Sequence, residues 1–353
     1  NQEELNAARH GLNETLRKHH VNPEDLPNTA ANLKSLSSTN GSGGVLDIFY
    51  PGWKFDVATN AKLLAVICQL WEAGFRNRDN DDETKPKTAR NGFGHDATSS
   101  SDVDYTQEED DDFRCHPFGT FDCNRAFAYT DRIGYRIPTS ISEDIGKREF
   151  QQQQQKGSEP KVIKKKKNRP RPLQRSLTPH LDCCPDTILS GDISNISKWR
   201  PIQSFVSLTD NLEPNTGGFE AALGFHRNFR HWAKSRTPTV AKNGQHRNLC
   251  VGEFTPIRPM EDKHVLSQVQ HVPCRAGSAV IWDNRIPHSN ARRNDSAIPR
   301  AVVYASFLPH VDINCRYVAA QLSSYLEGKI PTDQWIEFKD GEEDGTPAEE
   351  LEE

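Results

Sequence analysis

Apolar and polar residues alternate in short runs over the second half of the chain. Between residues 176 and 320, runs of a few apolar residues are separated by clusters of Gly, Pro and Asn, as in PIQSFVSLTD, VQHVPCRAGSAVIWD and PRAVVYASFLP. Short apolar runs between turn-forming residues are typical of strands in a sandwich or barrel. An aromatic-rich stretch over 125–137 has the same strand character. The pattern predicts a mainly β fold.

Helical spacing occurs on either side of this β-rich region. Apolar residues recur at intervals of three and four: Ala61, Leu64, Ala65 and Cys68. Asn60 is a suitable N-cap residue, so we expect a helix over 60–73. The sequence RYVAAQLSSYLE predicts a second helix over 316–327. The expected fold class is therefore mainly β with flanking helices.

Three polar segments interrupt the pattern. Residues 76–112 are rich in charged residues and serine, residues 148–175 contain five consecutive glutamines and the run KKKKNRPRP, and residues 329–353 are acidic. Such compositions favour solvated loops and disordered tails over packed structure. We expect a helical and polar N-terminal region over 1–112, a β domain over 113–328 and an acidic tail.

Composition adds limits on partners and compartment. A hydrophobic content of 34% and a mean hydropathy of −0.77 are low for a compact protein, which agrees with polar inserts around a smaller core. A net charge of −5 is too small to indicate a charged partner. No apolar run approaches the roughly 18–20 residues that span a bilayer, so no membrane partner is expected. Eight cysteines without a CxxC pair indicate a reduced protein of the cytoplasm or nucleus, with no disulfide-linked partner.

Candidate chemistry lies in the stretch TPHLDCCPDT, where His180 and Asp182 are two positions apart. Side chains i and i+2 of a strand point to the same face, so this pair would aim an imidazole and a carboxylate at one point. Alone, the spacing more often has a structural explanation. Two further residues change that balance, because His288 follows the apolar run AVIW and Arg300 opens the next strand. Two histidines and a carboxylate form a ligand set of non-haem Fe(II), and an arginine fork beside the metal suits a carboxylate.

The segment 178–309 resembles the phytanoyl-CoA dioxygenase (PhyH-like) family of Fe(II)/2-oxoglutarate oxygenases. Four pieces carry the resemblance: HLD, SFVSLTDNLEPNTGGFEAALGFHRN, AGSAVIWDNRIPH and PRAVVYASF. The resemblance implies a double-stranded β-helix core of the jelly-roll or cupin type. It also implies an Fe(II) ion held by three residues: His180, Asp182 and His288. Arg300 would bind the C5 carboxylate of the cosubstrate 2-oxoglutarate, and ascorbate would stimulate the enzyme.

Departures from the family pattern leave this ligand set intact. Leu181 stands where glutamine is frequent, and Asn290 stands where relatives often have serine, so both bear on the substrate more than on the metal. Halogenating relatives replace the ligand aspartate with a small residue, whereas Asp182 is present here. The implied activity is hydroxylation of a C–H bond in a small-molecule substrate, with release of succinate and CO2.

Residues of two predicted strands are candidates for the substrate pocket. In IQSFVSL, alternation places Gln203, Phe205 and Ser207 on one face, although the pattern does not show which face is inside. In YTDRIGYR, Tyr129 and Arg132 can approach the substrate or cosubstrate. An equally good interpretation of that second stretch is a half-buried strand with a surface arginine.

Other metal-type residues near these strands fit the site less well. His226 falls in a turn that lies outside the metal site of the family, and His310 has no arginine partner downstream. Cys183 and Cys184 lack a second pair at zinc-ligand spacing, so we expect them to be packing residues.

Two other functions remain open at this point. The basic run at 161–171, most simply a solvated loop, could instead be a nuclear localisation signal or dock a nucleic-acid or protein substrate. The β-helix could also serve as a non-catalytic binding module. The complete ligand set argues against a binding module, because a decayed site usually loses a ligand first.

Overall fold

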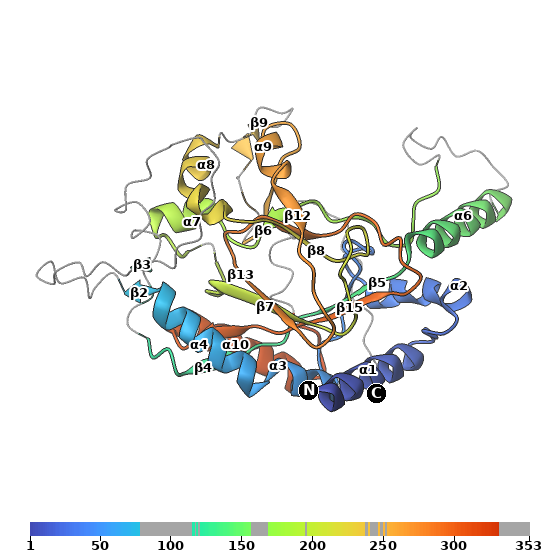
Figure 1. Ribbon diagram of the computed structural model, residues 1–353, viewed down its shortest axis with the longest axis horizontal. Helices are drawn as coiled ribbons and strands as arrows, with labels where there is room; N and C mark the ends of the chain where they lie inside the picture. Colours follow the sequence, from blue (N-terminus) through green and yellow to red (C-terminus); the bar gives the residue numbers. More distant parts are fainter. Residues whose placement is uncertain are drawn as a thin grey trace, which may run out of the picture.

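The computed structural model of the chain describes these residues: 1–77, 115–116, 118, 121–156, 169–194, 196–236, 239–240, 246–247, 250 and 253–331. Two five-stranded sheets lie at its centre, and all neighbouring strands in them are antiparallel (Figure 1). The first contains, in order, β1 (Val45–Leu46), β5 (Ile133–Arg136), β15 (Arg300–Tyr304), β7 (Ile202–Ser207) and β13 (Ala279–Asp283). The second contains β11 (Thr255–Pro256), β6 (His180–Leu181), β14 (His288–Asn290), β8 (Phe219–Ala222) and β12 (Val269–His271).

Side chains from both sheets meet in one hydrophobic core. Phe205 of β7 lies 5.5 Å from Phe219 of β8, and Phe219 lies 4.8 Å from Trp282 of β13, measured between ring centroids. Leu181 of β6 belongs to the same buried cluster. Because Phe205 faces the second sheet, the face of β7 that it shares with Gln203 points inward. The predicted mainly β fold with flanking helices is confirmed.

Helices at the two ends of the chain pack on the first sheet. They are α1 (Gln2–Lys18), α2 (Leu26–Thr29), η1 (Ala30–Leu36), α3 (Gly52–Ala58), α4 (Ala61–Gly74) and α10 (Asp312–Leu326). Figure 1 shows α1, α3, α4 and α10 along one side of the molecule. Leu12 and Leu16 of α1 are buried in the same cluster as Ile133 of β5 and Val303 of β15. The domain boundary near residue 112 stays a prediction, because 78–114 lie outside the described residues.

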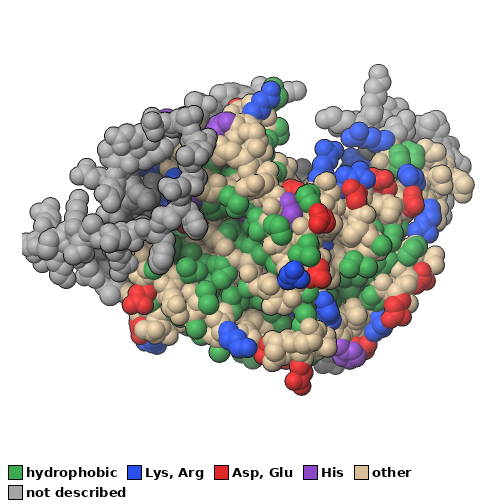
Figure 2. Space-filling model, viewed as in Figure 1, with side chains coloured by type: hydrophobic (Ala, Val, Ile, Leu, Met, Phe, Trp, Pro, Cys, Tyr) green, Lys and Arg blue, Asp and Glu red, His purple; other side chains and the backbone are tan. Residues whose placement is uncertain are grey.

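The predicted helix over 60–73 is confirmed as α4, but its buried face differs from the pattern used to find it. The Asn60 side chain caps the helix by accepting a hydrogen bond from the backbone N–H of Lys62 at 3.1 Å. The buried residues are spaced by four: Leu63, Ile67 and Trp71. Val66 and Leu70 remain exposed, and Figure 2 shows apolar side chains spread over the face that carries this helix. A helix that is apolar on several sides does not reveal its core face by periodicity.

Two other helices differ from the predictions. α10 begins at Asp312, before the predicted start at 316. α6 (Thr139–Lys156) continues through the five glutamines, which are exposed, where a solvated loop was expected. Glutamine has good helix propensity, so a polar run can extend a helix without burying a face. Most of the basic run at 161–171 lies outside the described residues.

Short elements complete the described part of the chain. Over the second sheet lie α7 (Pro185–Ser190), η4 (Phe225–Arg227), α8 (Phe229–Ser235) and α9 (Lys263–Leu266). Three two-stranded pairs are formed by β2 (Arg76–Asn77) with β3 (Cys115–His116), β4 (Ala126–Ala128) with β16 (Phe307–Pro309), and β9 (Thr239–Val240) with β10 (His246–Arg247). Among these described residues, no helix is both long and apolar enough to cross a bilayer.

The expectation that all cysteines are reduced is wrong for one pair. Cys184 and Cys250 form a disulfide with a Cα–Cα distance of 5.6 Å and a sequence separation of 66 residues. Their pairing could not be found by local spacing, because the tertiary fold brings the two segments together. Cys183 is unpaired and buried in the core of the second sheet, as expected of a packing residue. The disulfide removes the basis for assigning a reducing compartment from cysteine spacing.

Candidate metal centre

Neighbouring strands bring three ligand-type side chains to one point. His180 lies on β6 and His288 opens β14, and the two are direct cross-strand partners. Asp182 follows β6 immediately, so it shares the side of the strand that His180 faces. His180 Nε2 lies 3.5 Å from Asp182 Oδ1, and His288 Nε2 lies 3.7 Å from Asp182 Oδ2. One ligand atom from each residue lies within 4.8 Å of the others, so the group can bind a metal ion.

Backbone carbonyls orient both imidazoles. His180 Nδ1 lies 3.0 Å from the Thr178 carbonyl oxygen, and His288 Nδ1 lies 2.9 Å from that of Ile286. A carbonyl only accepts, so each Nδ1 carries the proton and donates it. Each Nε2 then keeps a free lone pair toward Asp182, which is the tautomer that a metal ligand needs.

Burial and neighbouring charge set the protonation states of this group. Burial lowers the pKa of His288 to about 4, so its imidazole is neutral near pH 7. Burial opposes ionisation of Asp182, but His180, His288, Arg200 and a hydrogen bond from Gln203 outweigh it and hold the pKa of the carboxyl well below its usual range. A neutral imidazole and an ionised carboxylate are the forms that bind a cation.

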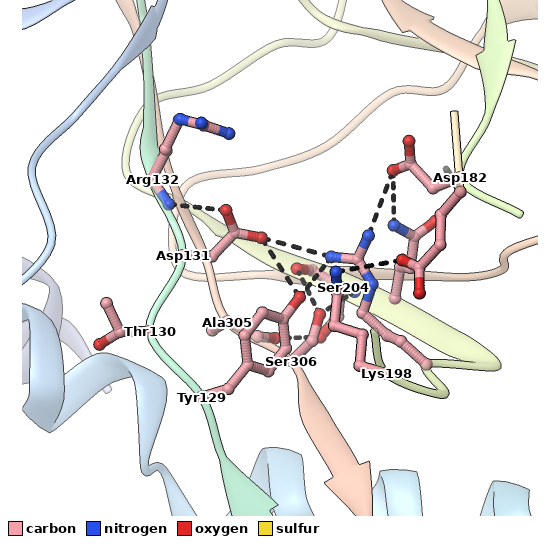
Figure 3. Close-up of polar contacts among 12 residues, drawn as sticks. Tyr129, Thr130, Asp131, Arg132, Asp182, Lys198, Ser204, Ala305 and Ser306 are labelled. Atoms are coloured by element: carbon pink, nitrogen blue, oxygen red, sulfur yellow. Dashed lines mark hydrogen bonds and ion pairs between the residues drawn. The ribbon is translucent and has the colours of Figure 1, made fainter. Parts of the chain in front are cut away.

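Asp182 is held from its other side by residues of a loop and of β7. Gln203 Nε2 donates to Asp182 Oδ2 at 2.7 Å, and Arg200 Nη2 lies 3.5 Å from the same oxygen. Arg200 also contacts Asp131 at 3.3 Å and donates to the Tyr129 hydroxyl. Figure 3 shows the Tyr129 and Asp131 side chains, from one segment of the chain, and the Asp182 side chain, from another, on either side of the same polar cluster. The arrangement limits the rotation of the carboxylate before any ion binds.

The structure brings some of the predicted pocket residues to the triad and others elsewhere. Gln203 contacts Asp182 directly, and Tyr129 reaches it through Arg200. Ser207 is buried and donates to the Thr209 carbonyl oxygen, whereas Arg132 forms an ion pair with Asp47 at 2.8 Å. Arg200 had no local sequence signal, since its partners lie far away in the chain. His226 and His310 belong to no metal-type group among the described residues.

Arg300 is buried with part of its guanidinium unsatisfied. Its side chain is 2% exposed, and Nη1 donates to Asn290 Oδ1 at 2.9 Å. Within the described part of the chain, Nη2 has no hydrogen-bond partner and no carboxylate pairs with the guanidinium group. Burial lowers the pKa of Arg300, and burial together with the Arg300 charge lowers that of Arg136, its cross-strand partner, to about 10. A carboxylate ligand would satisfy the remaining guanidinium nitrogen, Nη2.

A cavity opens beside Asp182. It has a volume of about 730 Å³ including its mouth, and its walls come from Phe75 at the end of α4, from His116 and Phe118, from α7 with the following loop, and from the turn after β13. A second group of ligand-type residues lies at its edge: Cys184, Asp186 and Cys250. The two sulfurs of that group are bonded to each other, so they are not thiolate ligands.

Three solved structures share the fold at low sequence identity. GlcNAc Inducible Gene 2, GIG2 (DUF1479), from Candida albicans has a TM-score of 0.58 and 11% identity over 99% of this chain and 67% of its own. A hypothetical protein from Escherichia coli has a TM-score of 0.52 and 12% identity over 95% and 71% of the two chains. A "Putative Oxidoreductase" from Salmonella typhimurium LT2 has a TM-score of 0.54 and 14% identity over 94% and 71%. No protein-family model and no curated protein matches the sequence.

Proposed function

We propose that the chain is an Fe(II)/2-oxoglutarate-dependent dioxygenase that hydroxylates a C–H bond of a small molecule. The observation that carries the proposal is the His180–Asp182–His288 group together with the buried Arg300, which donates to Asn290 two positions after His288 and has a guanidinium nitrogen left to bind an anion. The two antiparallel sheets that share a core support a double-stranded β-helix of the PhyH-like type. The name of the Salmonella neighbour, an oxidoreductase, agrees with this class of chemistry.

The donor set fits iron. Two imidazoles and one carboxylate are the donor set that non-haem Fe(II) oxygenases use, and they would hold the ion while leaving room for a cosubstrate and dioxygen. His180, Asp182 and His288 would hold the ion with the atoms that already face one another. When bound, Fe(II) with 2-oxoglutarate and dioxygen supplies the oxidation that hydroxylates a substrate, with succinate and CO2 as the other products.

The free side of Arg300 fits the distal carboxylate of 2-oxoglutarate. Asn290 holds one nitrogen of the guanidinium, so the other nitrogen keeps a fixed direction. The guanidinium carbon lies 5.0 Å from the centroid of the Phe205 ring, which restricts the group further. An anion that enters this position gains a charge-assisted hydrogen bond in a dry environment, where such bonds are strong.

Other side chains of the site orient and protect the reacting groups. Gln203 and Arg200 keep the Asp182 carboxylate directed at the two imidazoles. Rings pack against the histidines, with Phe254 at 4.8 Å from His180 and Trp282 at 5.1 Å from His288. These contacts exclude water from one side of the centre. Aromatic and aliphatic side chains line most of the cavity beside Asp182, with a few charged groups among them, and this kind of lining supports a small molecule as the substrate.

The test is succinate formation from 2-oxoglutarate by the purified chain with Fe(II), ascorbate and oxygen. We expect slow formation that His180→Ala abolishes and that His310→Ala, a matched histidine change outside the triad, leaves in place. A second measurement is the charge-transfer band that Fe(II) and 2-oxoglutarate give when added without oxygen. Folded protein that lacks both succinate formation and this band would overturn the proposal.

A further inference from the structure

We propose that the cavity beside Asp182 binds a substrate with a flat, neutral ring that carries an N–H donor. The inference rests on the proposed function, because the cavity reaches one of the proposed iron ligands. It follows from two features of the walls. One is a set of aromatic rings on one side, and the other is a buried carboxylate oxygen without a partner.

Aromatic rings form the apolar wall of the cavity. Trp199 stacks on Phe118 with ring centroids 4.7 Å apart and an interplanar angle of 20°. His116 lies 4.4 Å from Trp199, and Phe75 meets it edge-on at 5.8 Å. Four rings locked against one another present rigid faces to the cavity that they line. Such faces favour a flat ring, which can stack or meet them edge-on, over a flexible or branched chain.

Glu253 supplies the polar contact. Its side chain is 8% exposed, and Oε2 pairs with Lys198 at 3.1 Å. Oε1 is buried, and none of the described residues hydrogen-bonds to it, although Glu253 lines the cavity. A buried ionised oxygen without a donor is costly, so a ligand that donates a hydrogen bond there gains affinity. The ligand atom that faces Glu253 is therefore a donor.

The charges around this oxygen select a neutral donor. The charged groups of the cavity walls are already paired with one another: Lys198 with Glu253, Arg200 with Asp182, and Arg285 with Asp283. A charged group on the ligand, whether an ammonium or a carboxylate, would enter without a counter-charge that is free to pair with it, and burying an unpaired charge is costly. A ring N–H carries no net charge and still donates. The substrate class is thus a neutral nitrogen heterocycle or an aromatic amide.

The experiment compares indole with benzofuran, which has the same shape and no N–H, by calorimetric titration of the metal-free chain. We expect indole to bind at least about tenfold more tightly, as a hydrogen bond to a charged group gives. In Glu253→Gln, Lys198 holds the amide oxygen and the amide NH2 faces the cavity, so the preference for indole should disappear. Glu261→Gln, the same change at an exposed position, should keep it.

A second variant pair tests the aromatic wall independently. Trp199→Leu should weaken both probes by about two- to tenfold, whereas Trp199→Phe should keep most of the affinity. Equal affinity for indole and benzofuran in the wild type, or no binding of either, would overturn the inference. Binding without metal separates this outcome from the proposed activity: succinate formation without indole binding rejects the pocket assignment alone, and indole binding without succinate formation rejects the activity alone.

Discussion

Replacement of Arg300 by lysine tests the role assigned to the free guanidinium nitrogen. Lysine keeps the positive charge on a similar stem, but it is a point charge and cannot hold Asn290 and a carboxylate in fixed directions at once. In the wild type, Nη1 is occupied by Asn290 and Nη2 is free. The substitution therefore removes the directed contact while it leaves the net charge of the site unchanged.

The size of the effect follows from the contact that is lost. A hydrogen bond to a charged group contributes about 1.5–3 kcal/mol. Since about 1.4 kcal/mol corresponds to a factor of ten, the Kd for 2-oxoglutarate should rise by about 10- to 100-fold. Binding of Fe(II) itself should change little, because Arg300 contacts none of the three ligand side chains in the described structure.

The assay is an anaerobic titration of the Fe(II)-loaded protein with 2-oxoglutarate, followed by the charge-transfer band. Arg293→Lys, which makes the same change in an exposed ion pair, is the matched control and should bind like the wild type. A Kd for Arg300→Lys within about threefold of the wild type would refute the reasoning, since that is well under the about tenfold that 1.4 kcal/mol gives. The 2-oxoglutarate carboxylate would then have to bind elsewhere.

Three further predictions concern stability. A Cβ at Gly134 would lie 2.8 Å from a Val302 methyl carbon, whereas a Cβ at Gly74 would have no atom within 4 Å. Gly134→Ala should therefore lower the free energy of unfolding in urea by about 1–3 kcal/mol, and the control Gly74→Ala should not. Burial lowers the pKa of Lys54 from 10.5 to about 8, so between these pH values the unfolded chain binds more protons than the folded chain. The free energy of unfolding should therefore rise with pH across that window, by up to about 3 kcal/mol. Lys54→Met, measured over the same pH series, should lack this rise. Reduction of the Cys184–Cys250 disulfide should lower the free energy of unfolding by up to about 4 kcal/mol, as expected from the length of the loop that it closes. If a Cys184→Ser variant unfolds at the same denaturant concentration as the oxidised wild type, the disulfide does not form in solution.

The sequence predicted which side chains of the candidate site converge where local spacing encodes the convergence. His180 and Asp182 are two positions apart on one strand, and their convergence follows from strand geometry alone. His288 was placed by its position after an apolar run, and its pairing with His180 agrees with that placement. The mainly β fold class was predicted from the alternation of short apolar runs with turn-forming residues.

Contacts between distant segments could not be predicted in the same way. Arg200 joins Asp131 to Asp182, and Glu253 pairs with Lys198, but none of these pairs is close in sequence. A charged residue in a polar stretch has no periodicity that reveals burial. The core face of α4 was missed for the opposite reason, because too many of its positions are apolar to single out one stripe.

The buried charges of the site favour a catalytic role over a passive one. Burial of ion pairs such as Lys198–Glu253 seldom stabilises a fold, since hydrophobic residues of similar volume often do as well or better. Arg300 is less favourable still, because it is buried without any carboxylate of the described chain beside it. The buried Glu253 and the buried Arg300 both oppose folding when no ligand is bound. A hydrogen-bond donor beside Glu253 and an anion beside Arg300 would each turn this cost into binding energy. The residues that cost stability in the fold alone are therefore the ones through which ligands would stabilise it. The stabilisation of the Fe(II)-loaded chain by 2-oxoglutarate against thermal unfolding should grow with the logarithm of the 2-oxoglutarate concentration once that concentration exceeds Kd.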